Sequence, residues 1–377
     1  MVKGLYIHVP FCDHICNYCD FPKLYANASL QDRYMDALLG ELQMYQLSVG
    51  FSDLKTIYIG GGTPTALTVS QLRLLLDWLA AAVNLGQLAE FTMEANPENL
   101  TAEKIDLLLE YGVNRVSLGV QTFHDELLKG IGRTHSGQSA ESAIKRLKSK
   151  GMPRINLDLI YAIPGQTMEQ LAQDLETALN LEIDHISAYS LILEEHTKLY
   201  VDYMKDRLEL SENEVEASMF ETVMDTLGAA GYEHYEISNF TKGEPSHHNL
   251  LYWQNESYIG CGLGAHGYVN GARYSNTKSI NSYIRSVSLG TLPINESTTL
   301  ADAQKIEEEL FLGLRLLGGI DLKASSAKFG QDLEALYEAQ LKAMKAQSFI
   351  VYESGRAALT RQGLLMANTV FEQFLLS

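Results

Sequence analysis

Apolar and polar positions along the first 240 residues follow two alternating periods. Short apolar runs rich in β-branched residues occur at positions 5–10, 56–59, 91–95, 116–120, 155–161 and 186–193. Between them, apolar residues recur every three or four positions, as they do from Met35 to Leu42, which is the spacing of one helix face. Alternating strands and helices predict parallel strands joined by right-handed crossovers. We therefore expect an α/β fold, a partial (β/α)6 barrel.

Capping residues predict where several of the helices begin and end. Ser29, Thr68 and Thr167 each precede a helical pattern as N-caps, and the last two have a Gln three residues later that would complete a capping box. Gly112 and Gly151 stand where a helix should stop before the next strand. Barrels of parallel strands collect ligands at the carboxyl ends of the strands. Polar residues at those ends are therefore the first candidates for a site.

The pattern changes after residue 240. We expect a barrel over residues 1–240, a Gly-rich connecting segment over 241–300 and a mainly helical domain over 301–377. The last part combines three helical patterns with a predicted hairpin, FIVYESGRAALT, that turns at Gly355. That combination resembles a winged-helix module.

Composition and charge narrow the functional classes. The chain has 377 residues, of which 46% are hydrophobic and 20% charged, as in a globular protein with a large core. Its net charge of -18 opposes binding to phosphate backbones, so we expect no nucleic-acid partner in spite of the winged-helix pattern. The most apolar stretch, near Leu72 to Val83, contains Arg73 and Asp77, so no membrane span is expected.

Cysteine usage favours a metal framework over disulfides. Cys12, Cys16 and Cys19 fall within eight residues in the spacing C-x3-C-x2-C, and only Cys261 lies elsewhere. Three thiolates on one loop can hold three irons of a [4Fe–4S] cluster and leave the fourth iron open to chelate S-adenosylmethionine (SAM). The alternative is zinc, which prefers four ligands in paired C-x2-C spacing, with His14 in an awkward position to be the fourth. Such a cluster suits the reducing cytoplasm.

A second motif, GGGTPT at positions 60–65, follows the second predicted strand. Three glycines let the backbone approach a ligand closely, and their bare N–H and C=O groups can hold the charged methionine end of SAM. The alternative interpretation is a tight turn without a ligand. The neighbouring cysteine loop favours the SAM cradle.

The residues around the cysteines add a family resemblance. YIHVPFC at positions 6–12 and CNYCDF at 16–21 resemble the opening of the oxygen-independent coproporphyrinogen III oxidase family of radical SAM proteins, and the resemblance continues through GLRLLGGI in the C-terminal part. It implies SAM contacts at nine positions: Tyr6, Tyr18, Gly61, Gly62, Thr63, Glu94, Gln121, Arg133 and Asp158. The types fit, since a carboxylate suits the SAM ammonium or a ribose hydroxyl and a guanidinium suits its carboxylate.

The resemblance also implies one of two functions. One branch of the family oxidatively decarboxylates coproporphyrinogen III to protoporphyrinogen IX, and the other is a heme chaperone that delivers heme to respiratory enzymes. Phe21 stands where the oxidases carry a further Cys, the long N-terminal extension of the oxidases is missing, and HNLLYW at positions 248–253 matches the HNxxYW heme motif of the chaperones. The chaperone is therefore expected, with His248 as axial ligand of heme iron and Tyr252 and Trp253 packed against the porphyrin.

Other assignments stay open. The coproporphyrinogen III oxidase is the alternative function, another radical SAM enzyme acting on an unknown tetrapyrrole is a third, and no catalytic residue is assigned. His247 is an alternative heme ligand. Cys261 is a small buried residue or, less simply, a further cluster or heme ligand. His8 is expected to stand near the cluster without binding it.

The cluster assignment predicts that anaerobically reconstituted protein binds about four irons and four sulfides per chain. Replacement of Cys12, Cys16 or Cys19 by Ala should abolish this binding, because each removes a thiolate ligand. Cys261→Ala is the control and should keep the full iron content. Loss of iron from that control would show that the ligand set is misassigned.

Overall fold

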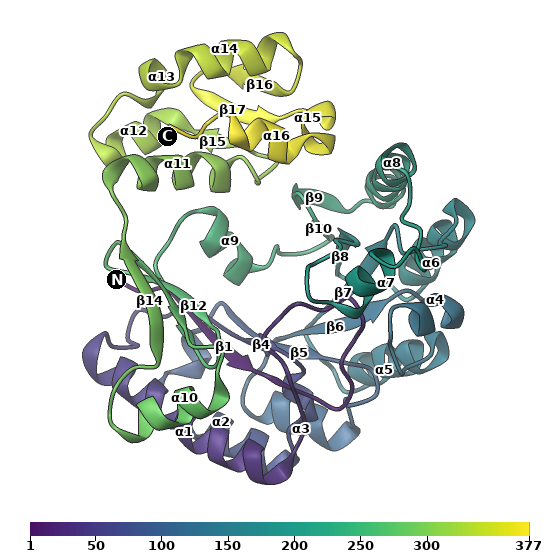
Figure 1. Cartoon of the computed structure of the whole chain (residues 1–377), viewed down its shortest axis with the longest axis vertical. Helices are drawn as coiled ribbons and strands as arrows, with labels where there is room; N and C mark the ends of the chain where they lie inside the picture. The colour runs from purple at the N-terminus through teal and green to yellow at the C-terminus, as the bar shows by residue number, and fades with distance from the viewer. Residues whose placement is uncertain (377) are drawn as a thin grey trace.

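Six parallel strands form the centre of the fold, as the alternating pattern predicts. The computed structural model describes residues 1–376 (Figure 1). The parallel strands are β1 (Gly4–Val9), β4 (Thr56–Gly61), β5 (Glu90–Ala95), β6 (Arg115–Gln121), β7 (Arg154–Tyr161) and β8 (His185–Ser190), each hydrogen-bonded to the next. Every one of them overlaps a predicted apolar run.

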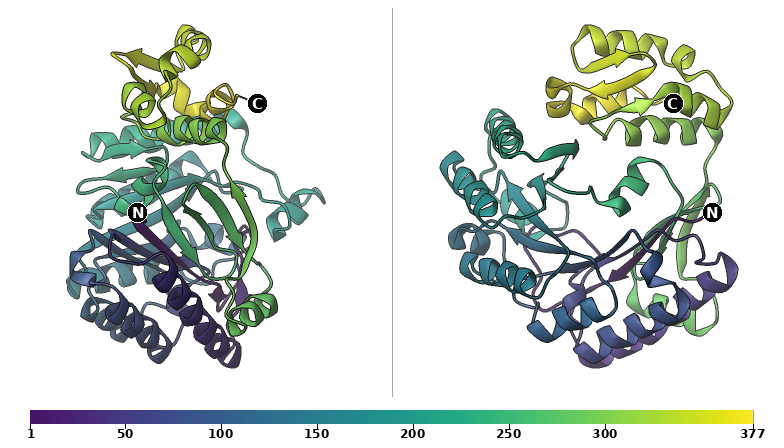
Figure 2. Two further views of the ribbon diagram at one scale, coloured as in Figure 1. Left: turned by 90° about the vertical axis from the view of Figure 1, so that its left-hand side faces the viewer. Right: turned by 180° about the vertical axis from the view of Figure 1, so that it is seen from behind.

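Helices cover the outer face of this curved sheet (Figures 1 and 2). They are α1 (Ala28–Ser48), α2 (Val69–Ala82), α3 (Ala102–Glu110), α4 (Asp125–Gly130), α5 (Gly137–Ser149), α6 (Met168–Asn180) and α8 (Asn213–Ala229). The short helix α7 (Lys198–Tyr203) lies beside the cysteine loop instead, where the Leu199 N–H donates to the Asn17 carbonyl. Because successive side chains of a strand point to opposite faces, Ile57 and Ile59 are fully buried in the core while Tyr58 lines an inner cavity. The strands therefore carry an apolar outer row and a polar inner row.

Residues 233–299 extend the same sheet at both edges. Their strands are β9 (Glu233–Glu236), β10 (Asn239–Thr241), β11 (Tyr258–Cys261), β12 (His266–Val269), β13 (Ala272–Asn276) and β14 (Ile294–Thr299). Over residues 1–376 the complete order is β14-β13-β12-β11-β1-β4-β5-β6-β7-β8-β10-β9, so the barrel is left open between β14 and β9. The segment 241–300 is thus more than the predicted connection, because β11 pairs with β1 and brings β12 to β14 with it.

Two further helices belong to this segment. Helix α10 (Ile280–Ser288) packs against α1. Helix α9 (His247–Trp253) lies inside the arc of the sheet, beneath the C-terminal domain (Figures 1 and 2).

The C-terminal domain is mainly helical and winged-helix-like, as expected. It contains α11 (Asp302–Gly313), α12 (Leu322–Phe329), α13 (Leu333–Leu336), α14 (Glu338–Ala346), α15 (Arg361–Leu365) and α16 (Ala367–Glu372) around a small sheet in the order β15 (Ile320–Asp321), β17 (Arg356–Leu359) and β16 (Ile350–Glu353). The hairpin turns at Ser354 and Gly355, whose φ angles are 54° and 86°. Arg361 holds the domain to α8 through Asp225 and Glu221.

Helix ends follow the capping prediction with one exception. Thr68 and Thr167 form capping boxes with the Gln three residues on, and Gly112 and Gly151 end helices with φ of 77° and 78°. The expected cap at Ser29 is wrong, because the Asn27 side chain accepts from the Leu30 N–H and starts α1 two residues earlier. None of the helices in the described chain has the length and apolar run needed to cross a membrane.

A buried carboxyl joins four parts of the fold behind β11. Glu41 of α1 is fully buried and accepts hydrogen bonds from the Gly262 N–H at 2.8 Å, the Asn276 amide at 2.6 Å and the Tyr283 hydroxyl. Burial raises the pKa of Glu41 to about 7, although the three donors pull it down. Between pH 4.5 and about pH 7, the folded state therefore retains a proton on Glu41 that the unfolded chain has lost.

This shift predicts a pH-dependent stability. Between the ordinary pKa of 4.5 and the folded-state pKa of about 7, the contribution of Glu41 falls as the pH rises, because only the folded state still holds the proton. The free energy of unfolding of Glu41→Gln, relative to that of the wild type, should increase by on the order of 2–3 kcal/mol between pH 4.5 and pH 7.5. Urea unfolding of both proteins at the two pH values measures this difference, and parallel pH profiles would contradict it.

Candidate functional site

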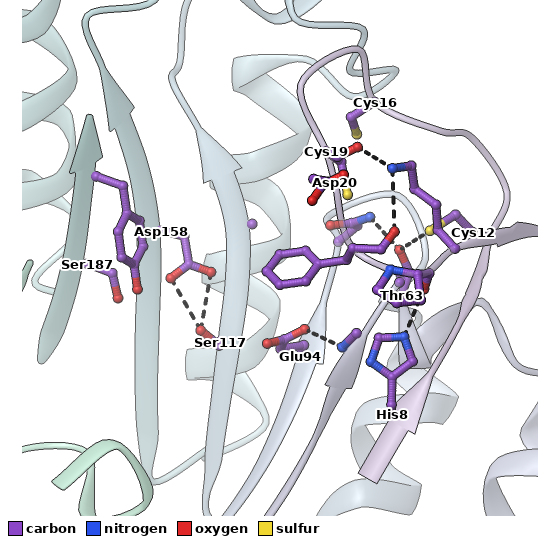
Figure 3. A pocket seen from close by; sticks show the side chains of 18 of the residues that line it. His8, Cys12, Cys16, Cys19, Asp20, Thr63, Glu94, Ser117, Asp158 and Ser187 are labelled. Atoms are coloured by element: carbon purple, nitrogen blue, oxygen red, sulfur yellow. Dashed lines mark hydrogen bonds between the residues drawn. The ribbon is translucent and has the colours of Figure 1, made fainter. Parts of the chain in front are cut away.

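The polar inner row of the sheet opens on one large cavity. Its volume is about 820 Å³, inside the range of roughly 300–1,000 Å³ typical of small-molecule sites. All nine predicted SAM positions line it, and so do Cys12, Cys16, Cys19, His248 and Tyr252. Figure 3 shows the cysteines on one side and Asp158 on a strand of the other side. The fold thus gathers into one space residues that the sequence separates by more than two hundred positions.

The two ends of the cysteine loop pair with each other just after β1. Cys12 ends β2 (Phe11–Cys12), which pairs with β3 (Leu24–Tyr25) on the far side of the loop. The Thr63 hydroxyl donates to the Cys12 Sγ at 3.7 Å, and the Arg133 guanidinium donates to the Cys16 Sγ at 3.6 Å. Burial raises the pKa of Cys12 to about 11 and shifts that of Cys19 in the same direction.

The positions of these thiols are compatible with an iron–sulfur cluster. Within residues 1–376, no three His, Cys, Asp or Glu side chains are arranged to hold one metal ion. The three thiols nevertheless face one cavity from one loop, and hydrogen-bond donors point at two of the sulfurs. Such donors suit sulfur ligands of a cluster.

Each glycine of the GGG motif makes room for a particular group. A Cβ on Gly60 would lie 2.7 Å from the Glu94 carboxyl, one on Gly61 would lie 2.6 Å from the His8 ring, and one on Gly62 would lie 2.9 Å from the Cys12 Sγ. Gly61 also has a φ of 118°, which disfavours side chains. The motif therefore forms a close-packed base, which we call the glycine floor, between the cysteine loop and the Glu94 carboxyl.

Glu94 stands on that floor with its carboxyl turned into the cavity. It accepts from the Gly61 N–H at 2.9 Å and from the Tyr58 hydroxyl at 2.8 Å. Burial raises its pKa to about 7. A cationic ligand group would stabilise the ionised form.

Arg133, which follows α4, reaches the cavity without a carboxylate partner among the described residues. Its guanidinium donates to the Asn96 Oδ1 at 3.1 Å and to the Gly119 carbonyl at 2.9 Å. Its Nε is buried and has no partner among the described residues. A buried cation so placed favours a ligand carboxylate.

Asp158 and Gln121 face the cavity from β7 and β6. Asp158 accepts from the Asn156 amide at 2.6 Å and from the Ser117 hydroxyl at 3.2 Å, and burial raises its pKa. It sits in the middle of its strand rather than at the end. A register shift after Gly119 gives Gln121 a φ of 69° at the end of β6.

The HNLLYW motif lies at the opposite end of the cavity from the cysteine loop. His248 is 1% exposed, and its Nδ1 and Nε2 share hydrogen bonds of 2.7 Å with the Thr56 hydroxyl and 2.8 Å with the Tyr252 hydroxyl. Thr56 begins β4, so the motif stands at the amino ends of the strands. Glu90 fixes the start of α9 by accepting from the Ser246 hydroxyl and from backbone N–H groups. Burial lowers the pKa of His248 to about 4, so the imidazole is neutral.

The other members of the motif are placed differently. Tyr252 lines the cavity, but the Trp253 indole does not and instead stacks on the Arg315 guanidinium at 4.3 Å. His247 is partly exposed and bonds Glu244 at 3.0 Å outside the cavity. Cys261 is fully buried in the core, away from the cavity lining, as its simpler interpretation predicts.

An aromatic column that the sequence analysis did not predict connects the two ends. Adjacent rings lie 5.1 to 6.1 Å apart, centroid to centroid, and the His8 Nε2 then bonds the Pro22 carbonyl of the cysteine loop at 2.8 Å. The rings, in order, are Tyr252, His248, Tyr58, Tyr6 and His8. His8 thus stands beside the loop, as expected. Tyr58 could have been found from its inward position in TIYIGG, where it alternates with two isoleucines.

Comparison with known proteins identifies the family. The model of the radical SAM superfamily matches residues 6–178, and that of the HemN C-terminal domain matches residues 300–366. The heme chaperone HemW of Bacillus subtilis is 43% identical over 376 residues, which cover 99% of both chains. HemW of Escherichia coli is 34% identical over 99% of this chain and 98% of its own.

A solved structure agrees on the fold. Coproporphyrinogen III oxidase (HemN) from Escherichia coli, a radical SAM enzyme, matches with a TM-score of 0.85 and 20% identity, over 100% of this chain and 90% of that one. At this identity the match supports the fold alone. The chain belongs to the radical SAM superfamily and, within it, to the family of the heme chaperone HemW.

Proposed function

We propose that this chain binds heme in its central cavity and delivers it to heme-dependent proteins, respiratory enzymes among them. The observation that carries the proposal is the placement of His248 and Tyr252, which form one end of a cavity large enough for a ligand. Relatives that match over the full length bear the name heme chaperone. The compartment we propose is the cytoplasm, because thiols that bind iron must stay reduced.

Membership in the radical SAM superfamily implies a [4Fe–4S] cluster and SAM. We assign the cluster to Cys12, Cys16 and Cys19, where it would supply an open iron for the methionine end of SAM. Gly61, Gly62 and Thr63 form the floor of the SAM site. Its walls are formed by Tyr6, Tyr18, Glu94, Gln121, Arg133 and Asp158.

Charge assigns roles to two of these residues. Arg133 pairs with the SAM carboxylate, since no carboxylate among the described residues accepts a hydrogen bond from it and its Nε has no partner there. Glu94 accepts from the ammonium or from a ribose hydroxyl, because its carboxyl is held toward the cavity by Tyr58 and Gly61.

Heme binding at the other end uses the neutral imidazole of His248. Its Nε2 becomes free for iron when the hydrogen bond to the Tyr252 hydroxyl breaks. Breaking this bond leaves the buried Tyr252 hydroxyl without a partner, which costs about 1–3 kcal/mol and offsets part of the energy of heme binding. Re-forming the bond favours release of the heme.

The exposure of the cavity mouth, which lies beside the cysteine loop, favours the chaperone over the oxidase. Phe21, where the resemblance places an oxidase Cys, is 64% exposed at that mouth. Radical decarboxylation needs a site closed to water and to other hydrogen donors. An open mouth suits a porphyrin that must leave again.

Hemin titration tests the heme ligand. Wild-type protein should give a red-shifted Soret band, and His248→Ala should weaken or alter it, because the variant lacks the axial imidazole. His247→Ala is the matched control and should do less, since that ring lies outside the cavity. A larger effect of His247→Ala than of His248→Ala would assign the axial ligand to His247 instead.

The same preparation tests the alternative function. Reconstituted wild-type protein should form no protoporphyrinogen IX from coproporphyrinogen III under anaerobic conditions. Robust product formation with SAM consumed in step would overturn the chaperone assignment.

SAM affinity tests the assignment of Arg133. Arg133→Ala should weaken SAM binding about tenfold or more, because losing a charge-assisted pair costs roughly 1.5–3 kcal/mol. Calorimetry on variants with a full iron content measures the loss, with Arg146→Ala as the control, since Arg146 bonds the Leu100 carbonyl outside the cavity. Unchanged affinity in an iron-replete Arg133→Ala protein would count against the SAM site.

A further inference from the structure

The mouth of the cavity carries a histidine that the proposed function has not used. His266 is the first residue of β12 and lines the cavity. It is exposed, and no hydrogen bond links its ring to any residue from 1 to 376. The buried His248, in contrast, has both ring nitrogens occupied.

The backbone before His266 fixes this ring next to the cysteine loop. Gly264 packs so closely on the loop that a Cβ there would lie 2.6 Å from Pro22 and 3.4 Å from the Lys278 side chain. The strand that His266 begins is separated from β1 only by β11. His266 is therefore held at the outer part of the cavity, whereas His248 stands at the amino ends of β1 and β4.

A cation and two bare apolar side chains surround the same opening. Lys278 lines the cavity, is exposed, and forms no ion pair within the described chain. Phe21 and Ile192 also line it and are 64% and 69% exposed. They belong to different segments, the cysteine loop and the turn after β8.

These groups match the chemistry of heme. A neutral imidazole binds heme iron, a lysine pairs with a propionate, and exposed apolar side chains cover a flat macrocycle. Burial, followed by the charge of Lys278, lowers the pKa of His266, so its imidazole is unprotonated at neutral pH. The mouth thus offers iron a second ligand that solvent and a partner can reach.

We propose that His266 is a second iron ligand, through which heme passes from His248 to the recipient protein. The proposal rests on the proposed heme-carrying function. The iron bond to the His248 Nε2 breaks first, because the two rings lie at different ends of the cavity, and a bond to the His266 imidazole forms once the heme has moved to the cysteine-loop end. A ligand of the recipient then displaces His266. Both imidazoles are neutral and the iron keeps its oxidation state, so no proton or electron is required. A recipient cannot reach the 1% exposed His248 directly.

Heme transfer to a scavenger tests this route. Full-length protein loaded with one hemin is mixed with excess apomyoglobin, and the Soret change is followed by stopped flow. His266→Ala should slow transfer about tenfold or more, with hemin affinity changed less than about threefold. Millimolar imidazole should accelerate transfer by His266→Ala more than transfer by the wild type, because it replaces the missing ligand only in the variant. Equal acceleration of both proteins would indicate a merely structural role of His266. Lys278→Glu should slow transfer in the same direction, because its carboxylate repels the propionates.

The controls separate this inference from the function on which it depends. His247→Ala, a histidine outside the cavity, should transfer at the wild-type rate. A wild-type protein that takes up no hemin would refute the proposed function itself. With hemin binding and the His248 dependence intact, a wild-type transfer rate in His266→Ala would overturn the route through His266. Loss of hemin binding in His266→Ala but not in His248→Ala would overturn it too, because His266 would then be the resident ligand.

Discussion

Alternation of side chains along parallel strands is the constraint on which this molecule depends. Each central strand must bury an apolar row against the outer helices and present a polar row to the inside. Polar groups buried in this way need partners. The Asp158 carboxyl finds them in Asn156 and Ser117, and Glu90 finds them at the start of α9. Arg133 lacks a complete set, with one buried nitrogen unpaired. Because Arg133 also lines the cavity, a ligand there can supply the missing partner.

Local chemistry was readable from the sequence, whereas long-range pairing was not. Strands and capping boxes follow from patterns a few residues long, as at Thr68 and Thr167. Strand β11 is too short to show a period of its own, and only its pairing with β1 makes residues 258–261 part of the barrel. The motif HNLLYW indicated heme chemistry, but nothing within it specifies which end of the strands it occupies. The contact of Trp253 with Arg315 likewise joins positions that are far apart in sequence.

The two ends of the cavity have different physical characters. Glycines, thiols and charged groups gather at the cysteine loop, where backbone and ligand can approach closely. The other end is formed by rings, Tyr252, His248 and Tyr58, whose few polar atoms are bonded to one another or to the strands. Barrels of this kind usually place chemistry at the carboxyl ends alone. Here the sheet stays open, so α9 can enter it and add a second, more apolar environment.

The stack of Trp253 on Arg315 has a mechanical consequence. Arg315 follows α11, its carbonyl accepts from the Ile237 N–H, and Leu317 bonds the Tyr235 carbonyl, so this stretch is tied to the strand region around β9 as well as to α9. Trp253 ends the same short helix that begins with His247 and His248. A displacement of the C-terminal domain would therefore strain this stack, which links the domain to the helix that carries His248 without passing through the cavity.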